Sequence, residues 1–493
     1  MTAWLDPLPD AQEMRVTDRW ATEQRGIASI ELMERAGSGL ARVAAELAPE
    51  GPLSVLCGKG NNGGDGLVCA RLLRQRGRDV EVLMFGEPAA GSDAHVNLER
   101  LPGAAPTGGS RVRSDGGLVI DALLGTGFAG ELEGELRAVV EALAAAGASV
   151  LACDVPSGVD ASTGEVHGPA VRARATVTFH AAKPGLWINP GKEHAGDVRV
   201  VDIGIPPGGP AHPPVGLMRR AALVGQIPRR QRDSNKFVSG HVIVVGGSPG
   251  LTGAPCMAAE AAMRAGAGYV TACIPASLSL IFETRLLEVM TLALEHHDSA
   301  GVDCVLGALK AGSALVLGPG LGSEAGEFSR ELAARAQRPL LLDADGLNAH
   351  AGQLASLRSR THPTVLTPHD GELARLLELE THEVAARRLT HARAAADRGG
   401  AVVVLKGDDT LVAEPGGRVA VSPGASPALA TAGTGDVLSG VCGAMLAKGM
   451  EPFEAACAAV TLHARAGRHA AEMHGPDGVI ASDVIQALPR SLA

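Results

Sequence analysis

Short runs of β-branched and other apolar residues, each followed by a glycine-rich turn and an Ala/Leu/Arg-rich stretch, recur along the whole chain. This order of patterns is typical of βα units arranged around parallel sheets. The sequence therefore predicts a doubly wound α/β fold, with a helix after the first strand that starts near Asp65. The strand candidates of the first half are Leu53–Gly58, Val80–Phe85, Leu118–Gly125, Ser149–Gly158 and Ala175–Phe179.

A proline- and glycine-rich break interrupts this pattern at Ile205–Val215, IPPGGPAHPPV. Because 493 residues are too many for one compact core, we interpret the break as a linker between two domains. We expect a first domain over 1–205, a linker over 206–224 and a second domain over 225–493. The strand candidates of the second half are His241–Gly247, Ala314–Gly322, Pro339–Asn348, Thr364–Glu372, Ala401–Gly407 and Ala428–Gly440.

Composition excludes several classes of partner. The formal net charge of −10, without a long Lys/Arg run, argues against a nucleic-acid partner and against an anionic membrane surface. The eight cysteines include no CxxC pair, so neither a zinc site nor a disulfide framework is expected. The first residues lack a basic region followed by an apolar stretch, so we expect no signal peptide and a cytoplasmic protein.

The motif NNGGDGL (Asn61–Leu67) follows a strand candidate and opens a helix. Its glycines allow close backbone approach to a ligand, and free N–H groups at a helix start favour an anion. Asparagine carbonyls and an aspartate also suit a hard cation. The alternative interpretation is an ordinary tight βα turn.

Two further strand ends of the first half carry polar residues. Asp121 leads into the glycine-rich loop GTGFAGE (Gly125–Glu131), and Asp154 opens DVPSG. Either aspartate alone could be a helix N-cap or part of a structural turn. Three polar strand ends in one crevice favour a binding site, and Asp154 is our candidate general acid or base.

The most informative stretch of the second half is ATAGTGDVLSG (Ala430–Gly440). A Gly-Thr-Gly turn that runs into a helix directs backbone N–H groups at a transferring phosphoryl group. Asp436 follows this turn and is placed to take a proton from a substrate hydroxyl. The alternative is a helix N-terminus stabilised by an acidic residue.

NNGGDGL, DALLGTG, DVPSGVD and TVTFHAAKPGL occur in the order typical of the NAD(P)H-hydrate epimerase domain, which residues 10–205 resemble. The resemblance implies a Rossmann-like three-layer domain that binds the hydrated dinucleotide. It also implies K⁺ on Asn62, Asp121 and Ser157. The implied substrate contacts are Asn61, Asn62, Gly63, Gly64, Asp65, Gly125, Thr126, Gly127, Phe128, Ala129, Gly130, Glu131 and Asp154.

The second half resembles the ribokinase superfamily, and within it the NAD(P)H-hydrate dehydratase family, over about residues 225–493. The motifs GPGLG, LDADGLN, TPHDGE and KGDDT carry this resemblance. It implies a nucleotide, ADP or ATP, bound with Mg²⁺. The implied substrate contacts are Ala254, Gly320, His369 and Asp436. The implied nucleotide contacts are Lys406, Gly407, Asp408, Asp409, Thr410, Thr431, Ala432, Gly433, Thr434 and Gly435.

The chain departs from the dehydratase pattern at two positions. The family usually has proline where this sequence has Asp370, in TPHDGE, and where it has Leu287, before EVMT.

Together the two resemblances imply metabolite repair. The first domain would epimerise the R and S forms of hydrated NADH or NADPH at C6, and the second would dehydrate the S form through phosphorylation and loss of phosphate. An alternative is a vitamin-precursor kinase of ribokinase type with a non-catalytic, dinucleotide-binding N-terminal module. By resemblance we also expect a homo-oligomer.

Overall fold

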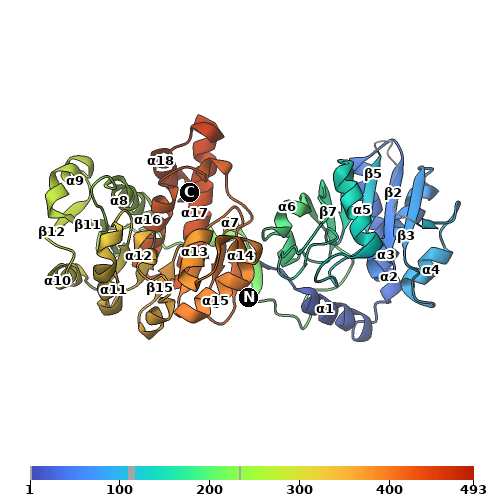
Figure 1. The fold of residues 1–493 in the computed structure, drawn as a ribbon, viewed down its shortest axis with the longest axis horizontal. Helices are drawn as coiled ribbons and strands as arrows, with labels where there is room; N and C mark the ends of the chain where they lie inside the picture. The colour runs from blue at the N-terminus through green and yellow to red at the C-terminus, as the bar shows by residue number, and fades with distance from the viewer. Residues whose placement is uncertain (1–2, 109–116, 233–234, 493) are drawn as a thin grey trace. The chain divides into compact units, whose positions relative to one another are not determined.

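A computed structural model of the chain describes residues 3–108, 117–232 and 235–492. The chain forms two compact α/β units, each with helices packed on a sheet (Figure 1). One unit comprises Pro7–Gly216, and the other comprises the chain from Leu217 onward together with Thr2–Asp6.

The N-terminal unit is built on a seven-stranded sheet in the order β4-β3-β2-β5-β6-β7-β8, and each adjacent pair is parallel. The five strands predicted for this half are present, but those predicted over Leu118–Gly125 and Ser149–Gly158 end earlier, at Ala122 and Cys153. The strand order reverses between β2 and β5, and such a reversal is where open α/β sheets bind ligands. The strands are β2 (Leu53–Gly58), β3 (Val80–Phe85), β4 (Thr107–Gly108), β5 (Leu118–Ala122), β6 (Ser149–Cys153), β7 (Ala175–Phe179) and β8 (Asp197–Val201).

The helix after β2 begins earlier than the sequence predicts. It begins at Asn61, and the predicted start near Asp65 is wrong. A Cβ atom on Gly63 would lie 1.8 Å from the carbonyl oxygen of Gly58, so glycine at this position lets the helix form directly under the strand end. The helices of this unit are α1 (Ala11–Glu23), α2 (Ser29–Leu47), α3 (Asn61–Gln75), α4 (Asp93–Glu99), α5 (Gly134–Ala145) and α6 (Gly191–Ala195).

The C-terminal unit is built on an eleven-stranded sheet in the order β1-β9-β18-β17-β16-β15-β14-β13-β10-β11-β12. From β16 to β12 adjacent strands are parallel, whereas β17 is antiparallel to both of its neighbours. The strands are β1 (Leu5–Pro7), β9 (Val215–Met218), β10 (His241–Val245), β11 (Tyr269–Pro275), β12 (Met290–Leu294), β13 (Ser313–Leu317), β14 (Leu340–Leu342), β15 (Thr364–Leu366), β16 (Val402–Leu405), β17 (Leu411–Ala413) and β18 (Val419–Val421).

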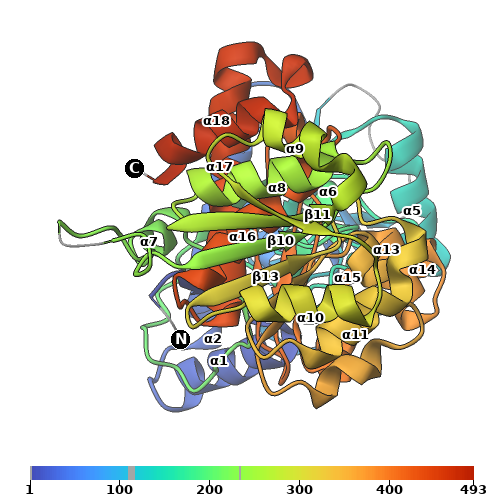
Figure 2. The same ribbon diagram turned by 90° about the vertical axis from the view of Figure 1, so that its left-hand side faces the viewer.

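Helices cover both faces of this sheet: Figure 2 shows α8 on one side of β10, β11 and β13, and α10 and α11 on the other. In the described part of the chain, no helix combines the length and the apolar character needed to cross a membrane. The helices are α7 (Arg220–Val224), α8 (Gly253–Arg264), α9 (Ser279–Arg285), α10 (Ser299–Ala308), α11 (Gly326–Arg335), α12 (Asp345–Asn348), α13 (Asp370–Leu377), α14 (Thr381–Ala386), α15 (Arg388–Gly399), α16 (Thr434–Ala447), α17 (Pro452–His474) and α18 (Ala481–Leu492).

Two stretches differ from expectation. The segment 206–224, expected as a linker, contains β9 and α7, and the division between the units falls inside it. The stretch Ala428–Gly440, among the strand candidates, contains no strand: the second half of it is the start of α16. The reason is local, because Gly433 has a φ of +87° and the small residues after it continue as a helix buried against its neighbours.

Candidate active sites

In the N-terminal unit, three neighbouring strands bring the predicted polar loops together. β2, β5 and β6 are adjacent in the sheet, and the Asn61–Asp65 loop, the Gly125–Glu131 loop and Asp154 follow them. Because parallel strands end at one edge, the structure assembles these segments around the reversal point between β2 and β5.

Asp154 is the most highly bonded carboxylate of this site. Its oxygens accept hydrogen bonds from the N–H of Thr126 (2.8 Å), the hydroxyl of Thr126 (2.5 Å), the hydroxyl of Thr178 (3.2 Å) and the ammonium of Lys183 (2.8 Å). Burial opposes its ionisation, but Lys183 and the Thr126 donors outweigh burial and lower the pKa of Asp154. The group is therefore a carboxylate at neutral pH, as a proton acceptor must be. Its φ of +66° is uncommon for a residue with a side chain.

Sequence reasoning missed Lys183. Its side chain is 1% exposed and donates to Asp154, to the hydroxyl of Thr178 (2.7 Å) and to the carbonyl of Phe179 (3.0 Å). These three acceptors match the three N–H bonds of an ammonium. The available signal was a lysine just after the apolar run Ala175–Phe179, inside a motif that already carried the family resemblance.

The three residues expected to hold K⁺ have different surroundings. Asp121 is fully buried and accepts hydrogen bonds from the N–H (2.9 Å) and hydroxyl (2.7 Å) of Ser157, and from the N–H of Leu123 (3.2 Å). Burial outweighs these bonds and raises the pKa of Asp121 to about 6. Within the described residues, both polar atoms of the Asn62 amide are buried without a hydrogen-bond partner. An orphaned buried oxygen is a suitable ligand for a cation.

The glycine-rich loop after β5 lies against these groups. A Cβ atom on Gly125 would lie 3.1 Å from the Asn62 amide and 2.9 Å from Asp154. The loop thus brings Asn62 and Asp154 to one place. Asp65 is buried nearby, and burial with the charge of Asp154 raises its pKa well above the usual value. At the far end of the loop, the Glu131 side chain does not share in these contacts and forms an exposed ion pair with Arg137 (2.8 Å).

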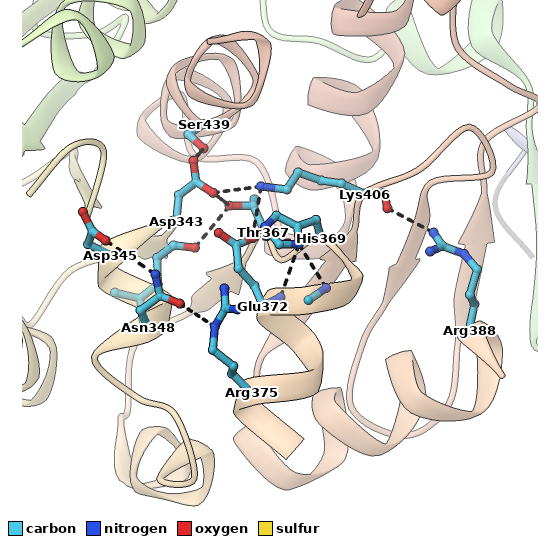
Figure 3. A network of polar contacts seen from close by, with 12 residues as sticks. Asp343, Asp345, Asn348, Thr367, His369, Glu372, Arg375, Arg388, Lys406 and Ser439 are labelled. Atoms are coloured by element: carbon cyan, nitrogen blue, oxygen red, sulfur yellow. Dashed lines mark hydrogen bonds and ion pairs between the residues drawn. The ribbon is translucent and has the colours of Figure 1, made fainter. Parts of the chain in front are cut away.

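In the C-terminal unit, three polar residues directly follow three adjacent parallel strands. Asp343 follows β14, Thr367 follows β15 and Lys406 follows β16 (Figure 3). Asp343 is 2% exposed and accepts hydrogen bonds from Lys406 (3.1 Å), the Thr367 hydroxyl (2.9 Å) and the Ser439 hydroxyl (2.7 Å). Sequence reasoning assigned no role to Asp343, although an aspartate directly after an apolar run was visible in LDADGLN.

Asp436 lies in the first turn of α16, beside this network. Burial and the charge of Asp343 raise the pKa of Asp436 to about 7, against the opposing effect of Lys406. A Cβ atom on Gly435 would lie 3.7 Å from the Lys406 ammonium, so the helix start and the lysine adjoin each other. The first N–H groups of α16 have no intrahelical partner. A carboxyl that titrates near neutral pH beside free N–H groups suits proton abstraction coupled to phosphoryl transfer.

The predicted substrate contacts other than Asp436 lie in two places. His369 caps α13: its Nδ1 accepts from the N–H of Gly371 (3.0 Å) and of Glu372 (3.3 Å), and Glu372 accepts from the N–H of His369 (2.9 Å). Glu372 also lies 3.5 Å from Lys406, which joins α13 to the network. Ala254 and Gly320 adjoin each other, because a Cβ atom on Gly320 would lie 3.3 Å from that of Ala254.

The predicted nucleotide turn contains side chains that face inward. The Thr410 hydroxyl donates to the carbonyl of Gly407 (2.6 Å) and the Thr434 hydroxyl to that of Leu429 (2.8 Å). The buried carboxylate of Asp409 accepts from Arg388 (3.0 Å). The Thr410 and Thr434 side chains thus hold the local backbone, whereas Asp409 is bonded to the Arg388 side chain.

Comparisons with known proteins identify relatives of both halves of the chain. A family model described as NAD(P)H-hydrate dehydratase matches residues 242–490, and one described as YjeF-related protein N-terminus matches residues 29–185. A bifunctional NAD(P)H-hydrate repair enzyme from Moorella thermoacetica is 39% identical over 98% of this chain and 96% of its own. One from Salinibacter ruber is 39% identical over 99% of this chain and 96% of its own.

A solved structure supports the fold of the second unit. A ribokinase-like superfamily protein from Enterococcus faecalis superposes with a TM-score of 0.50 at 27% identity, over 57% of this chain and 96% of its own. The predicted ribokinase-like fold of the second half is confirmed. With relatives that match over both halves, the chain belongs to the family of bifunctional NAD(P)H-hydrate repair enzymes.

Proposed function

We propose that the site of the N-terminal unit epimerises hydrated NADH or NADPH at C6 and that the site of the C-terminal unit uses ADP or ATP to dehydrate the S epimer. The repair function follows from the family, and the assignment of residues is our proposal. One observation carries it most directly: Asp436, with a pKa raised to about 7, adjoins Lys406 and the free N–H groups of a helix start.

For epimerisation we assign the base to Asp154. C6 of the hydrate is bonded both to a hydroxyl oxygen and to the ring nitrogen. Its configuration is lost when the C6–O bond or the C6–N bond opens, and is regained when that bond closes. Either route requires a proton to leave and return to a heteroatom. Asp154 is ionised, and Lys183 holds it in place from a buried position, which supports its role as the proton acceptor.

For dehydration we assign the base to Asp436. It takes the proton of the C6 hydroxyl, the hydroxyl oxygen attacks the terminal phosphorus of the nucleotide, and the shortened nucleotide leaves. The ring nitrogen then expels phosphate from C6, and loss of a proton from C5 restores the dihydropyridine. Phosphorylation converts hydroxide, a poor leaving group, into phosphate, which explains why a lyase would have a kinase fold.

The proposed metal ions fit in different ways. K⁺ would be held by Asn62, whose buried amide oxygen has no other partner among the described residues, with the bonded pair Asp121 and Ser157. When bound, it would supply charge that holds an anionic part of the substrate. Mg²⁺ would enter on the nucleotide phosphates. Within the described residues no three His, Cys, Asp or Glu side chains gather as a ligand set, and an ion carried by phosphates does not need one.

The contacts named for each ligand remain part of this proposal. The Asn61–Asp65 and Gly125–Glu131 loops would bind the hydrated dinucleotide in the first unit. Ala254, Gly320 and His369 would bind it in the second, with the nucleotide over 406–410 and 431–435. We further propose a cytoplasmic homo-oligomer that has neither a nucleic-acid partner nor a membrane partner.

A product balance tests the dehydratase proposal. The chain is incubated with the S epimer, Mg²⁺ and either ADP or ATP, and reduced cofactor, phosphate and shortened nucleotide are measured. We expect the three products in equal amounts, with one nucleotide preferred. Absence of reduced cofactor with either nucleotide would instead support the vitamin-precursor kinase alternative, which the match of the relatives over both halves disfavours.

A further inference from the structure

Arg388, the first residue of α15, is buried between two carboxylates from different parts of the C-terminal unit. Its side chain is 4% exposed. It is paired with Asp370, the first residue of α13, and with Asp409 of the turn after β16, at 3.0 Å. It also donates to the carbonyls of Leu405 (3.4 Å) and Lys406 (3.1 Å). Figure 3 shows the bond to Lys406.

Stabilisation of its own helix does not explain this arginine. A cation in the first turn of a helix opposes the helix dipole, and burying a guanidinium costs free energy unless carboxylates and carbonyls compensate. Here the four acceptors named above all come from outside α15. The side chain therefore serves the two segments that it connects.

The two connected segments carry residues assigned to the substrate and to the nucleotide. α13 begins with His369 as its cap and contains Glu372, which lies 3.5 Å from the Lys406 ammonium. The turn after β16 begins with Lys406, whose ammonium contacts Asp343 and adjoins the GTGD helix start. The Arg388 guanidinium donates to the backbone carbonyl of Lys406 and pairs with Asp370 at the start of α13. It therefore connects the two segments.

Asp370 makes this link particular to the present sequence. The related family pattern has proline here, and both proline and aspartate suit the first position of a helix. Only aspartate adds a charged acceptor for Arg388.

We propose that Arg388, through Asp370 and Asp409, is a positioning residue that fixes the nucleotide turn relative to α13, so that Lys406 is held at the reacting edge of the sheet. The inference deepens the proposed dehydratase function and rests on it. Loss of the Arg388 link should act selectively, because a displaced nucleotide turn affects nucleotide binding and phosphoryl transfer more than binding of the hydrate.

Steady-state kinetics of the full chain test this inference with Arg388→Met, Arg388→Lys and Asp370→Asn. Because sub-ångström misplacement of a reacting group is costly, we expect Arg388→Met to lower kcat/KM for the nucleotide on the order of ten- to a hundredfold, with KM for the hydrate nearly unchanged. Arg388→Lys should rescue little, since an ammonium cannot bridge two carboxylates and two carbonyls. Arg398 lies on the same helix and forms an exposed ion pair with Glu378 at 3.5 Å. Arg398→Gln removes that pair, is the matched control and should match the parent.

Asp370→Asn decides the matter if Arg388→Met does not fold. It should show the same selective loss to a smaller degree. Where Arg388→Met folds, the double variant should show no loss beyond that of Arg388→Met. A parental nucleotide kcat/KM in Asp370→Asn, or a rise in KM for the hydrate as large as the loss in nucleotide kcat/KM, would overturn the inference. Failure of the parent chain to dehydrate the S epimer would count against the proposed function itself, so the two failures are distinguishable.

Discussion

At the scale of single residues, the two carboxylates assigned as bases lie in opposite electrostatic environments. Asp154 contacts an ammonium and two hydroxyl groups, and its pKa is lowered. Asp436 is buried near a second carboxylate, and its pKa is raised to about 7. The first is ionised throughout the neutral range, whereas the second changes its charge within that range.

This difference predicts a pH dependence for dehydration. Since Asp436 must be ionised to accept a proton, kcat/KM should rise with pH and level off above about 7. Lys406 lowers the pKa of Asp436, so Lys406→Met should move the rising part of the pH profile to higher pH. Substitution of the exposed Lys310 by Met should leave that rise in place. Rate profiles from acid to mildly alkaline pH check this, and a rise that stays in place in Lys406→Met would contradict the assignment.

The environment of Asp154 predicts the effect of removing Lys183. Lys183→Met leaves a buried carboxylate without its cation, which should destabilise the N-terminal unit by about 3–5 kcal/mol. It should also raise the pKa of Asp154 and abolish epimerisation near neutral pH, while dehydration of the S epimer continues. Urea unfolding and separate assays of the two activities measure this. Epimerisation at the parental rate in a folded Lys183→Met chain would show that Lys183 has no role in the reaction. Lys236→Met, at an exposed position in the other unit, is the control.

Residue roles were only partly predictable from the sequence. Asp154 and Asp436 could be singled out as candidates because each follows a strand or turn in a motif with a chemical meaning. Lys183 and Asp343 were missed because their partners, Asp154 and Lys406, are 29 and 63 residues away in the chain. Asp409 was expected to contact nucleotide, but its side chain faces Arg388, a pairing that no local pattern reveals.

At the scale of elements, the start of α3 depends on close backbone packing. Gly63→Ala would place a Cβ atom 1.8 Å from the Gly58 carbonyl oxygen, and we expect a loss of about 1–3 kcal/mol or more as strand and helix separate. Gly60→Ala in the same loop meets no atom within 4 Å and should cost no more than about 0.5 kcal/mol. Chemical denaturation compares the pair, and equal costs would contradict the packing account.

Strands were predictable where several apolar residues run into a glycine or an aspartate, as in β2 and β14. Several strands were missed. β8 lies at the sheet edge and is mostly exposed or half-buried, and β4 has only two residues. β11, β12, β17 and β18 do not run into a glycine or an aspartate. β1 and β9 were missed because they lie far apart in the sequence, at the start and the end of the N-terminal unit. They pair with each other at the edge of the C-terminal unit's sheet.

At the scale of the whole molecule, the first residues of the chain contribute to the core of the C-terminal unit. Trp4 is fully buried, and its ring lies 6.1 Å from that of Phe453. Trp4→Ala should therefore lower the free energy of unfolding of that unit by about 3–5 kcal/mol. Leu280→Ala, at a side chain that is 77% exposed, should cost less than about 0.5 kcal/mol. Calorimetry on the full chain checks this, and an unchanged C-terminal transition in Trp4→Ala would contradict it.

The central claim is that one chain holds two sites which act on the same damaged cofactor, one through Asp154 and the other through Asp436. The most direct measurement follows recovery of the reduced cofactor's absorbance from a mixture of R and S hydrates with K⁺, Mg²⁺ and the preferred nucleotide. The parent chain should convert both epimers, Asp154→Asn should convert the S epimer quickly and the R epimer no faster than it isomerises unaided, and Asp436→Asn should give no recovery. Conversion of both epimers at the parent rate by either variant would contradict the account.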